Sequence, residues 1–513
     1  ARALQYNALG EPVLRTHVDG ISLEGNVLVS NVTVDSGNIV VWQGTNPWVT
    51  TGNANVSVIG NISGITTLPA ISGNVGVSGN VSITQMPAIS GNVSITQMPA
   101  VTGNIHVYGN VDVDHMPNIG IIGNGTAAII SALALIRGSL FSKKNTKIYC
   151  IHNPAIPSLT VGESISPTLL EDMRSCLNSN IDLSELDSTP RFGGDHFWED
   201  QKGNNFRLHY PTGGMHANSE KLSKYLTEKF LQHFPNMFFE YHENIINTVG
   251  SEKGVDIFCE SGNNYKFDYV IDCSGFPSDI ELNSDLYELL DFETVNTVLI
   301  YPHFKKYEEI YTEALFHDNG WMFGVPLQHR KAFGYMYNNK ITKKEDAIDH
   351  FKKLKPVIEE DKLRFITWRQ YFRKKIMENN IVFNGNKLYF FEPAQGLPLH
   401  YYYNVMIVFS SLFFDGFFSR IDIPHYMNKF HEIQIQKIQD LIALNYVGTN
   451  KMTSDFWNQT SNEAKIRLKK STRFSEYAIN CIRQNEIERY WYHDSTLMDQ
   501  YIKGFNINLH DFV

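Results

Sequence analysis

Two glycines and an alanine stand at a spacing that suits the binding of a diphosphate. In the segment NIGIIGNGTAAIISALALIRG, Gly123, Gly125 and Ala128 form the pattern G-x-G-x-x-A. The first glycine permits a tight turn, the second lets a diphosphate approach the backbone, and the small third residue lets a helix pack closely on a strand. The diphosphate would bind N–H groups at the start of the helix, at Thr126 and Ala127. Glycine-rich turns of this kind are common, so the dinucleotide site needs support from the surrounding elements.

A dinucleotide-binding unit requires a strand, a helix and a second parallel strand, and the sequence offers all three. The apolar run 119–122 favours a strand, and residues 127–136 have the spacing of a helix. The segment TKIYCIHNP, residues 146–154, is the predicted second strand. An acidic residue usually binds the ribose at the end of this strand. His152 and Asn153 stand there instead, and either can form a hydrogen bond with a ribose hydroxyl.

The composition is that of a globular protein with two or more domains. The chain has 513 residues, 42% of them hydrophobic, and a formal net charge of -10, which argues against binding to nucleic acid. The five cysteines lie far apart without a C-x-x-C pair, so they indicate neither disulfides nor zinc, and we predict no metal site.

The N-terminal residues lack a signal-peptide pattern, and Asp415 interrupts the most apolar later stretch. We therefore expect neither secretion by a signal peptide nor a membrane span.

Residues 1–116 consist of short repeats. Gly-Asn followed by alternating valine, isoleucine and small polar residues recurs, and GNVSITQMPA occurs twice, at 79–88 and 91–100. So short a repeat must stack on neighbouring repeats or on other chains to bury an apolar face. We predict a repetitive all-β stalk that oligomerises, preferably as a homotrimer, similar to repeat regions in fibre and baseplate proteins of tailed viruses. The alternative is a flexible linker, in which the strict alternation would serve no purpose.

The segment NPAIPSLTVGESISPTL, residues 153–169, resembles the SPxIPxxxVGExxxPxL segment of flavin-dependent halogenases of the tryptophan-halogenase type. In that family the segment is a strap that runs along the flavin and links it to the halide site. The resemblance therefore implies flavin contacts at four consecutive residues of the strap, which are Val161, Gly162, Glu163 and Ser164.

Further resemblances follow in the family's order. The segment DYVIDCSGF, residues 268–276, is similar to the second flavin strand, which implies that Asp272 and Gly275 lie beside the cofactor. The segment GWMFGVP resembles W-x-W-x-I-P and would line the substrate site or tunnel with Trp321, Phe323 and Pro326. NGNKLYFFEPAQGLPL resembles GNxxxFxEPLEST and retains Gly385 at the cofactor and Glu392 at the catalytic site. For residues 117–513 the resemblance implies a Rossmann-type FAD-binding domain, a mixed-sheet substrate domain and C-terminal helices.

The same resemblance implies a two-component reaction. A separate flavin reductase supplies reduced FAD (FADH2), O₂ and a halide ion give hypohalous acid, and the acid crosses a tunnel to an electron-rich carbon of a small aromatic or similar substrate. The block around Trp321 is believed to separate the two sites, which favours halogenation over direct oxygenation. The fibre-like repeats imply a viral protein in the host cytoplasm or on the virion.

Two departures from the family pattern concern catalysis. Where the family has an essential lysine, STPRFGGDHFWED places Arg191 or Phe192, with Lys202 further along. Arg191 can donate hydrogen bonds to an oxidant but does not deprotonate. Gln395 replaces a glutamate and cannot act as a base near neutral pH.

The halide site also departs from the pattern. Gly396, Leu397 and Pro398 follow where the family has Ser-Thr-Gly, and proline has no N–H for a halide. We expect a looser halide site that prefers bromide or iodide to chloride. Two alternatives remain: a virion protein with an inactive flavoprotein domain, or a flavin monooxygenase that uses no halide.

Two other polar or aromatic groups are predicted to be structural. The neighbours Asp195 and His196 form an acid–histidine pair of a kind that is more often structural than catalytic. The aromatic residues of HYYYN, residues 400–404, are predicted to pack in the interior rather than to line a pocket.

Overall fold

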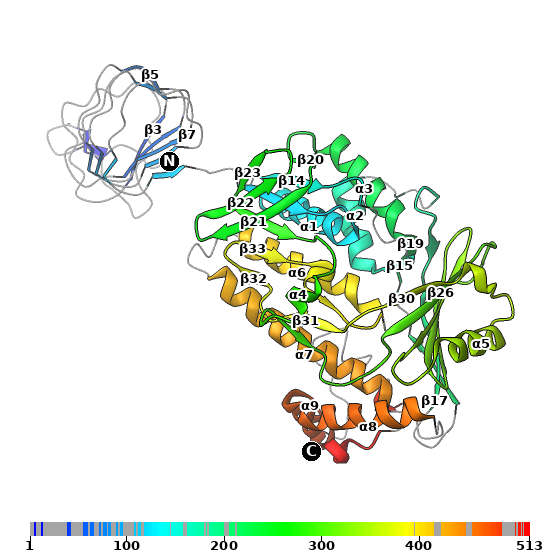
Figure 1. Cartoon of the computed structure of the whole chain (residues 1–513). Coiled ribbons are helices and arrows are strands. Elements are labelled where there is room, and N and C mark those ends of the chain that lie inside the picture. The colour runs from blue at the N-terminus through cyan, green and yellow to red at the C-terminus, as the bar shows by residue number, and fades with distance from the viewer. Residues whose placement is uncertain are drawn as a thin grey trace. The chain divides into compact units, whose positions relative to one another are not determined.

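The computed structural model describes residues 117–513 with gaps and, before residue 117, only short strands. The gaps are 144, 157–161, 179–180, 182–183, 200–204, 211–212, 394–395, 415–421, 448–453, 485–497, 499–500, 504, 506 and 513. The chain divides into two compact units, unit 1 (Ala1–Met116) and unit 2 (Pro117–Val513) (Figure 1).

Unit 1 contains short strands that pair mainly in parallel. Val75 pairs with Val93 and Val93 with Val111, each eighteen residues further along the chain. Successive repeats therefore stack on one another within a single chain, which is one of the two arrangements that the sequence left open. One sheet has the order β12-β10-β7-β4-β3, a second β11-β9-β6 and a third β5-β8, and β1 pairs with β2 antiparallel. The strands are β1 (Gln5–Tyr6), β2 (Pro12–Val13), β3 (Asn38–Trp42), β4 (Asn55–Ile59), β5 (Ile62–Ile65), β6 (Ile71–Ser72), β7 (Val75–Ser78), β8 (Val81–Ile83), β9 (Ile89–Ser90), β10 (Val93–Ile95), β11 (Val107–Tyr108) and β12 (Val111–Val113).

Unit 2 begins with a parallel sheet of the dinucleotide-binding kind. Its order is β20-β14-β13-β24-β33-β32, and only the last pairing is antiparallel. The predicted strand, helix and second parallel strand are confirmed as β13 (Asn118–Ile122), α1 (Thr126–Ser142) and β14 (Lys147–His152). The other strands are β20 (Phe238–His242), β24 (Tyr269–Asp272), β32 (Met377–Glu378) and β33 (Ile381–Phe383).

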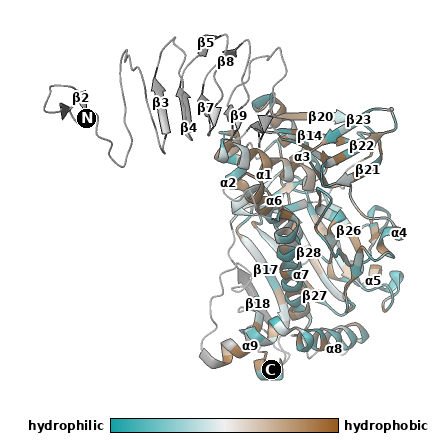
Figure 2. Cartoon of the chain, turned by 90° about the vertical axis from the view of Figure 1, so that its left-hand side faces the viewer, coloured by the Kyte–Doolittle hydropathy of each residue, from teal (hydrophilic) through white to brown (hydrophobic). Residues whose placement is uncertain are grey.

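Helix α1 is buried on nearly all sides because α6 (Leu397–Phe414) packs against it. Both helices are rich in apolar residues (Figure 2). At their contact, a Cβ on Gly138 would lie 2.0 Å from Ser410 Oγ and 2.6 Å from the ring of Phe414, so any larger residue there would force these side chains to move. Tyr401, Tyr402 and Tyr403 of α6 are buried, which confirms the prediction that the HYYYN aromatic residues pack in the interior.

A second, seven-stranded sheet confirms the predicted mixed sheet. Its order is β18-β17-β27-β28-β29-β26-β30, in which β17 and β27 are parallel and the other neighbours antiparallel. Helix α5 (Lys344–Leu354) packs on this sheet through Ala347, Ile348 and Phe351 (Figure 1). The strands are β17 (Gly193–Glu199), β18 (Asn205–Tyr210), β26 (Thr297–His303), β27 (Tyr311–His317), β28 (Gly320–Pro326), β29 (Lys331–Tyr337) and β30 (Arg364–Thr367).

A small sheet and the C-terminal helices complete unit 2. The small sheet has the order β15-β19-β16 and carries the strap, since β15 is Gly162–Ile165. Its partners are β16 (Thr189–Pro190) and β19 (Met215–Asn218). The predicted C-terminal helices are confirmed as α7 (Ile423–Val447), α8 (Asp455–Lys470) and α9 (Thr472–Gln484).

Unit 2 contains further helices and strands. They are α2 (Pro167–Leu177), α3 (Ser219–His233), α4 (Asp279–Leu282), β21 (Ile245–Ser251), β22 (Gly254–Cys259), β23 (Asn264–Phe267), β25 (Tyr287–Leu289), β31 (Tyr371–Arg373), β34 (Tyr389–Phe390), η1 (Glu360–Lys362), η2 (Gly385–Lys387) and η4 (Leu509–Phe512). Among the residues that the structure describes, no helix combines the length and the apolar character needed to cross a membrane.

Candidate functional site

The turn after β13 depends on Gly123. This residue has φ +111°, and a Cβ there would lie 2.6 Å from the carbonyl oxygen of Cys273. Its N–H donates to the carbonyl of Ile151 at 2.9 Å, which fixes the turn between β14 and β24. Any other residue would be strained in φ and would clash with backbone, so the sequence reading of a tight glycine turn is correct.

Gly125 stands beside open space at the start of α1. It is the N-cap of the helix with φ −74°, and a Cβ there would meet no heavy atom of the described residues within 4 Å. Gly275, which follows β24 with φ +98°, is equally open. The first turn of α1 has no acidic residue of its own and no side-chain cap, which leaves backbone N–H groups at the positive end of the helix for an anion. These features fit a diphosphate held by backbone at Gly125, Thr126 and Ala127.

Two segments that are distant in sequence close this edge of the sheet. The backbone N–H of Asn384 donates to the carbonyl of Asp272 at 2.9 Å, which joins β24 to the turn before η2. At Gly385, φ is +64° and a Cβ would lie 2.6 Å from the Cβ of Ala127. Asp272 also accepts the N–H of Ser274 at 3.0 Å through Oδ1. Asp272, Gly385 and Ala127 therefore gather at one edge, and their role as flavin contacts stays a prediction.

The strap contacts the first turn of α1 through Glu163. Thr126 Oγ1 donates to Glu163 Oε1 at 3.0 Å, whereas Glu163 Oε2 is buried and has no hydrogen-bond partner in the described part of the chain. Burial raises the pKa of Glu163 to about 7, although the bond from Thr126 lowers it. The carboxyl group can therefore hold or release a proton near neutral pH. Ser164 lies close to Gly396: a Cβ added to Gly396 would be 3.6 Å from the Cβ of Ser164. Val161 lies outside the described residues.

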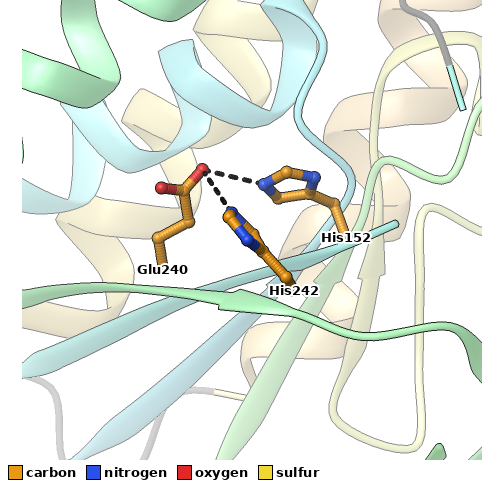
Figure 3. Close-up of side chains that lie close together, drawn as sticks. All are labelled: His152, Glu240 and His242. Carbon is orange, nitrogen blue, oxygen red and sulfur yellow. Dashed lines mark hydrogen bonds and ion pairs between the residues drawn. The ribbon is translucent and has the colours of Figure 1, made fainter. Parts of the chain in front are cut away.

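His152 stands at the end of β14 with one ring nitrogen engaged and one without a partner. Its Nε2 lies 2.8 Å from Glu240 Oε1 on the neighbouring strand β20 (Figure 3). Its Nδ1 is buried and has no hydrogen-bond partner among the described residues. A ring nitrogen available at this position fits a hydrogen bond to a ribose hydroxyl.

Arg191 is an interior residue. It is 7% exposed, whereas Phe192 is 55% exposed, and Lys202 lies outside the described residues. Arg191 Nε donates to Thr312 Oγ1 at 3.1 Å. Of the two positions that the alignment left open for the family lysine, Arg191 is thus the one that brings a cation into the interior.

His216, which sequence reasoning missed, completes this group. Its Nε2 lies 2.8 Å from Thr312 Oγ1, and its Nδ1 lies 3.4 Å from Thr189 Oγ1. Burial first, then the charge of Arg191, lowers the pKa of His216 to about 3, so the imidazole is neutral. Thr189 Oγ1 donates to the carbonyl of Pro326 at 2.8 Å, which links the group to the end of β28. The only sequence signal was the position of His216 in a short strand.

Glu392 lies in a buried network behind Trp321. It is 2% exposed and accepts a hydrogen bond from Tyr446 Oη at 2.5 Å. Trp321 Nε1 in turn lies 3.2 Å from Tyr446 Oη. Burial raises the pKa of Glu392 to about 7, against the lowering effect of its hydrogen bonds. Phe323 lies two residues after Trp321 on the same strand, with ring centroids 6.3 Å apart, and Gln395 lies outside the described residues.

A sequence model of the tryptophan halogenase family matches residues 118–255 and 248–497, which is well over half of the chain. The chain belongs to the tryptophan halogenase family. The match begins at the first residue of β13, and it includes every candidate site residue named above. Unit 1 lies outside it.

Curated relatives match only part of this halogenase-family chain. It is 22% identical over 217 residues to tryptophan 6-halogenase of Streptomyces albogriseolus, which covers 40% of each protein. It is 20% identical over 304 residues to tryptophan 7-halogenase of Lentzea aerocolonigenes, which covers 56% of this chain and 55% of that one. The chain thus spans from two fifths to just over half of the length of these relatives.

Solved structures share the fold at low identity. The tryptophan halogenase from Shewanella frigidimarina has a TM-score of 0.64 and 16% identity, covering 77% of this chain and 89% of that one. The flavin-dependent halogenase BrvH from Brevundimonas sp. BAL3 has a TM-score of 0.63 and 16% identity, covering 77% and 90%. Unit 2 therefore has the fold of these halogenases.

Asp195 and His196 do not act as a pair in this family member. Asp195 bonds Arg207 with both carboxylate oxygens at 2.6 Å, whereas His196 Nδ1 lies 2.9 Å from Tyr501 Oη. The two residues are neighbours on β17 and so point to opposite faces of the sheet. Each residue thus bonds a separate partner within the fold, which agrees with the structural interpretation.

Proposed function

We propose that the chain is a flavin-dependent halogenase that uses FADH2 from a separate reductase, O₂ and a halide. Its product would be an electron-rich small molecule halogenated through hypohalous acid. The observation that carries the proposal is the strap. Glu163 bonds the first turn of α1, while its neighbour Ser164 pairs in β15 with His216, which shares Thr312 with Arg191. The strap thus joins the proposed diphosphate site at Gly125, Thr126 and Ala127, which we call the diphosphate edge, to the buried Arg191.

The residues at the diphosphate edge fit FAD. Backbone at Gly125 and Gly275 leaves room for the cofactor, the α1 N-terminus favours its negative charge, and His152 offers a ring nitrogen to its ribose. Bound FAD would supply the oxidising chemistry when its reduced form reacts with O₂. Glu163, with a pKa of about 7 and an unpartnered Oε2, would hold or release a proton beside it.

Arg191 would position the oxidant. A buried guanidinium is a fixed donor, and Thr312, which accepts from Arg191 and also bonds His216, holds it in place. Hypohalous acid can accept its hydrogen bonds, whereas a haloamine of the kind a lysine could form is excluded because guanidinium does not deprotonate. Glu392 would hold Trp321 in position through Tyr446, which bonds both residues. Gln395 would orient groups by hydrogen bonding.

The start of α6 is the basis for the proposed halide preference. The helix begins at Leu397, so Pro398 stands in its first turn, where a missing N–H costs no helical hydrogen bond. One amide is consequently lost from the place where the family holds chloride. A halide held by fewer donors is retained less tightly, which favours the more easily oxidised bromide or iodide.

The test is halide-dependent turnover by the full chain. The protein is incubated with a flavin reductase, NADH, FAD and chloride, bromide or iodide in turn, and halogenation of monochlorodimedone or a phenol is measured. We expect product with bromide or iodide and less with chloride. FAD binding without turnover would support an inactive flavoprotein domain instead, and oxygenation without halide would support a monooxygenase.

Arg191→Ala tests the positioning role. We expect halogenation to fall by ~100-fold, the cost of losing one preorganised donor, while flavin reoxidation continues at its normal rate. Arg191→Lys, which keeps a cation, is the matched variant and should retain more activity. Unchanged halogenation in Arg191→Ala would mean that the oxidant is unguided.

A further inference from the structure

Two histidines and a glutamate meet at the carboxyl end of the parallel sheet. They are His152 at the end of β14 and Glu240 and His242 on β20 (Figure 3). The sequence indicated no metal site because its cysteines have no ligand spacing. These three residues become neighbours only through strand pairing.

Strand geometry places the three side chains on one face. His152 pairs with His242 in the parallel register of β14 and β20. Glu240 lies two residues before His242, and residues two apart on a strand point to the same side of a sheet. The cluster is therefore a consequence of the register.

The ligand atoms lie at distances that an ion can bridge. Glu240 Oε1 is 2.8 Å from His152 Nε2 and 3.6 Å from His242 Nε2, and the three candidate ligand atoms all lie within 4.8 Å of one another. A tetrahedral zinc ion with bonds of about 2.0–2.1 Å separates its ligands by roughly 3.4 Å. The observed separations lie on both sides of that value.

The burial of the cluster is graded in a way that suits a bound cation. His152 is 8% exposed and gives a rigid ligand, Glu240 is partly buried, and His242 is exposed. Ions can thus enter from the solvent side, and water can fill a fourth position. With Nε2 on a metal, the unpartnered Nδ1 of His152 would carry the ring proton and could donate it to an outer hydrogen bond, as metal-bound histidines usually do.

We propose that His152, Glu240 and His242 bind a divalent transition-metal cation of the zinc class, with water as a fourth ligand. Two imidazoles and one carboxylate are ligands of this kind of ion. The ion would cross-link β14 to the edge strand β20 and fix the ring of His152. This site does not depend on the proposed halogenase activity.

The test uses the full chain freed of metal by a chelator and dialysed. Zn²⁺ is titrated by calorimetry, and Co²⁺ is added as a spectroscopic probe of tetrahedral geometry. We expect one equivalent bound at this site, a higher melting temperature with Zn²⁺, and visible bands typical of tetrahedral cobalt. Absence of a bound equivalent would overturn the proposal.

Variants assign the binding to these residues. His242→Ala and Glu240→Gln should each weaken Zn²⁺ binding by ~10-fold or more and abolish the cobalt spectrum. His425→Ala, at an exposed histidine of α7, is the matched control and should bind as the native chain does. Because His242 is exposed, its variant is expected to fold, which circular dichroism checks. Equal Zn²⁺ affinity in His242→Ala, Glu240→Gln and the native chain would overturn the assignment.

Discussion

Gly125 and Gly123 serve the same turn for different physical reasons. Gly123 is required by the fold, because its φ is positive and its missing Cβ makes room for Cys273. Gly125 has an ordinary φ and open space around it, so the fold alone would tolerate another residue there. Its glycine is explained by a ligand that approaches the backbone.

Gly125→Asp is expected to abolish FAD binding without unfolding the protein. A carboxylate there would occupy the space of the diphosphate and repel it at the helix start, whereas its Cβ would meet no heavy atom of the described residues within 4 Å. Flavin fluorescence titration measures the binding, and thermal unfolding of the apo protein checks the fold. Unaltered FAD affinity would show that the diphosphate does not bind at this turn.

Glu392 gives a pH-dependent stability with a definite sign. Its pKa rises from 4.5 to about 7 on folding, so between these pH values the folded chain holds a proton that the unfolded chain has released. Its contribution to stability therefore falls as pH rises through this window and is constant above it. Glu392→Gln cannot ionise. Between pH 5 and pH 8, the free energy of unfolding of the variant should therefore rise by up to about 3 kcal/mol relative to that of the native chain.

The measurement is the difference in melting temperature between Glu392→Gln and the native chain at the two pH values. Glu288→Gln, at an exposed glutamate of β25, is the control and should show a constant difference. A Glu392→Gln difference that is equally constant would mean that Glu392 is already ionised at pH 5.

At the scale of elements, η2 and α1 approach each other through Gly385 and Ala127. A Cβ on Gly385 would come within 2.6 Å of the Cβ of Ala127, and φ at Gly385 is +64°. This contact brings the segment that carries Glu392 to the first turn of α1. The close packing of two distant segments is thus decided by the smallest side chains.

Gly385→Ala is expected to lower the melting temperature and to weaken FAD binding. The clash and the left-handed φ should each lower the free energy of unfolding by about 1 kcal/mol or more. Adding Ala127→Gly removes the clash but not the backbone strain. A double-mutant cycle should therefore show that the two changes together cost less than the sum of the single changes. Strict additivity would show that the two segments do not press on each other.

At the scale of the whole molecule, we expect the two units to have different functions. The family match starts at residue 118, and the hydrophobic cores described for unit 2 contain only its own residues. We propose that unit 1 is an oligomerisation stalk, with a trimer preferred. The pairing of its repeats within one chain does not by itself require other chains.

Deletion of residues 1–116 is expected to leave a folded domain with unchanged FAD affinity and a smaller oligomer. Light scattering of the full and shortened chains measures the particle mass, and flavin titration measures the affinity. An identical stoichiometry would contradict the stalk proposal, and loss of folding would contradict the independence of unit 2.

The sequence by itself determined the features that depend on neighbours along the chain. Apolar runs, glycine spacing and helical periodicity were enough for β13, the turn at Gly123, α1 and β14, because the residue types and spacing within each short segment favour its local conformation. The pairing of β13 and β14 with other strands then stabilises them. The ordered family motifs extended this reading to β24, β28 and the C-terminal helices. The burial of the HYYYN aromatic residues also followed from their residue types.

Tertiary structure alone decided which distant side chains meet. Arg191 became an interior group because Thr312 and His216 come from other strands, and Glu392 found Tyr446 and Trp321 across the fold. His152, Glu240 and His242 meet only because β14 and β20 pair in one register. Strand order and register fix these contacts. The same packing buries His216 and Glu392, and this burial shifts their pKa values. No local pattern encodes them, because the atoms involved are brought together only when the sheets and helices pack.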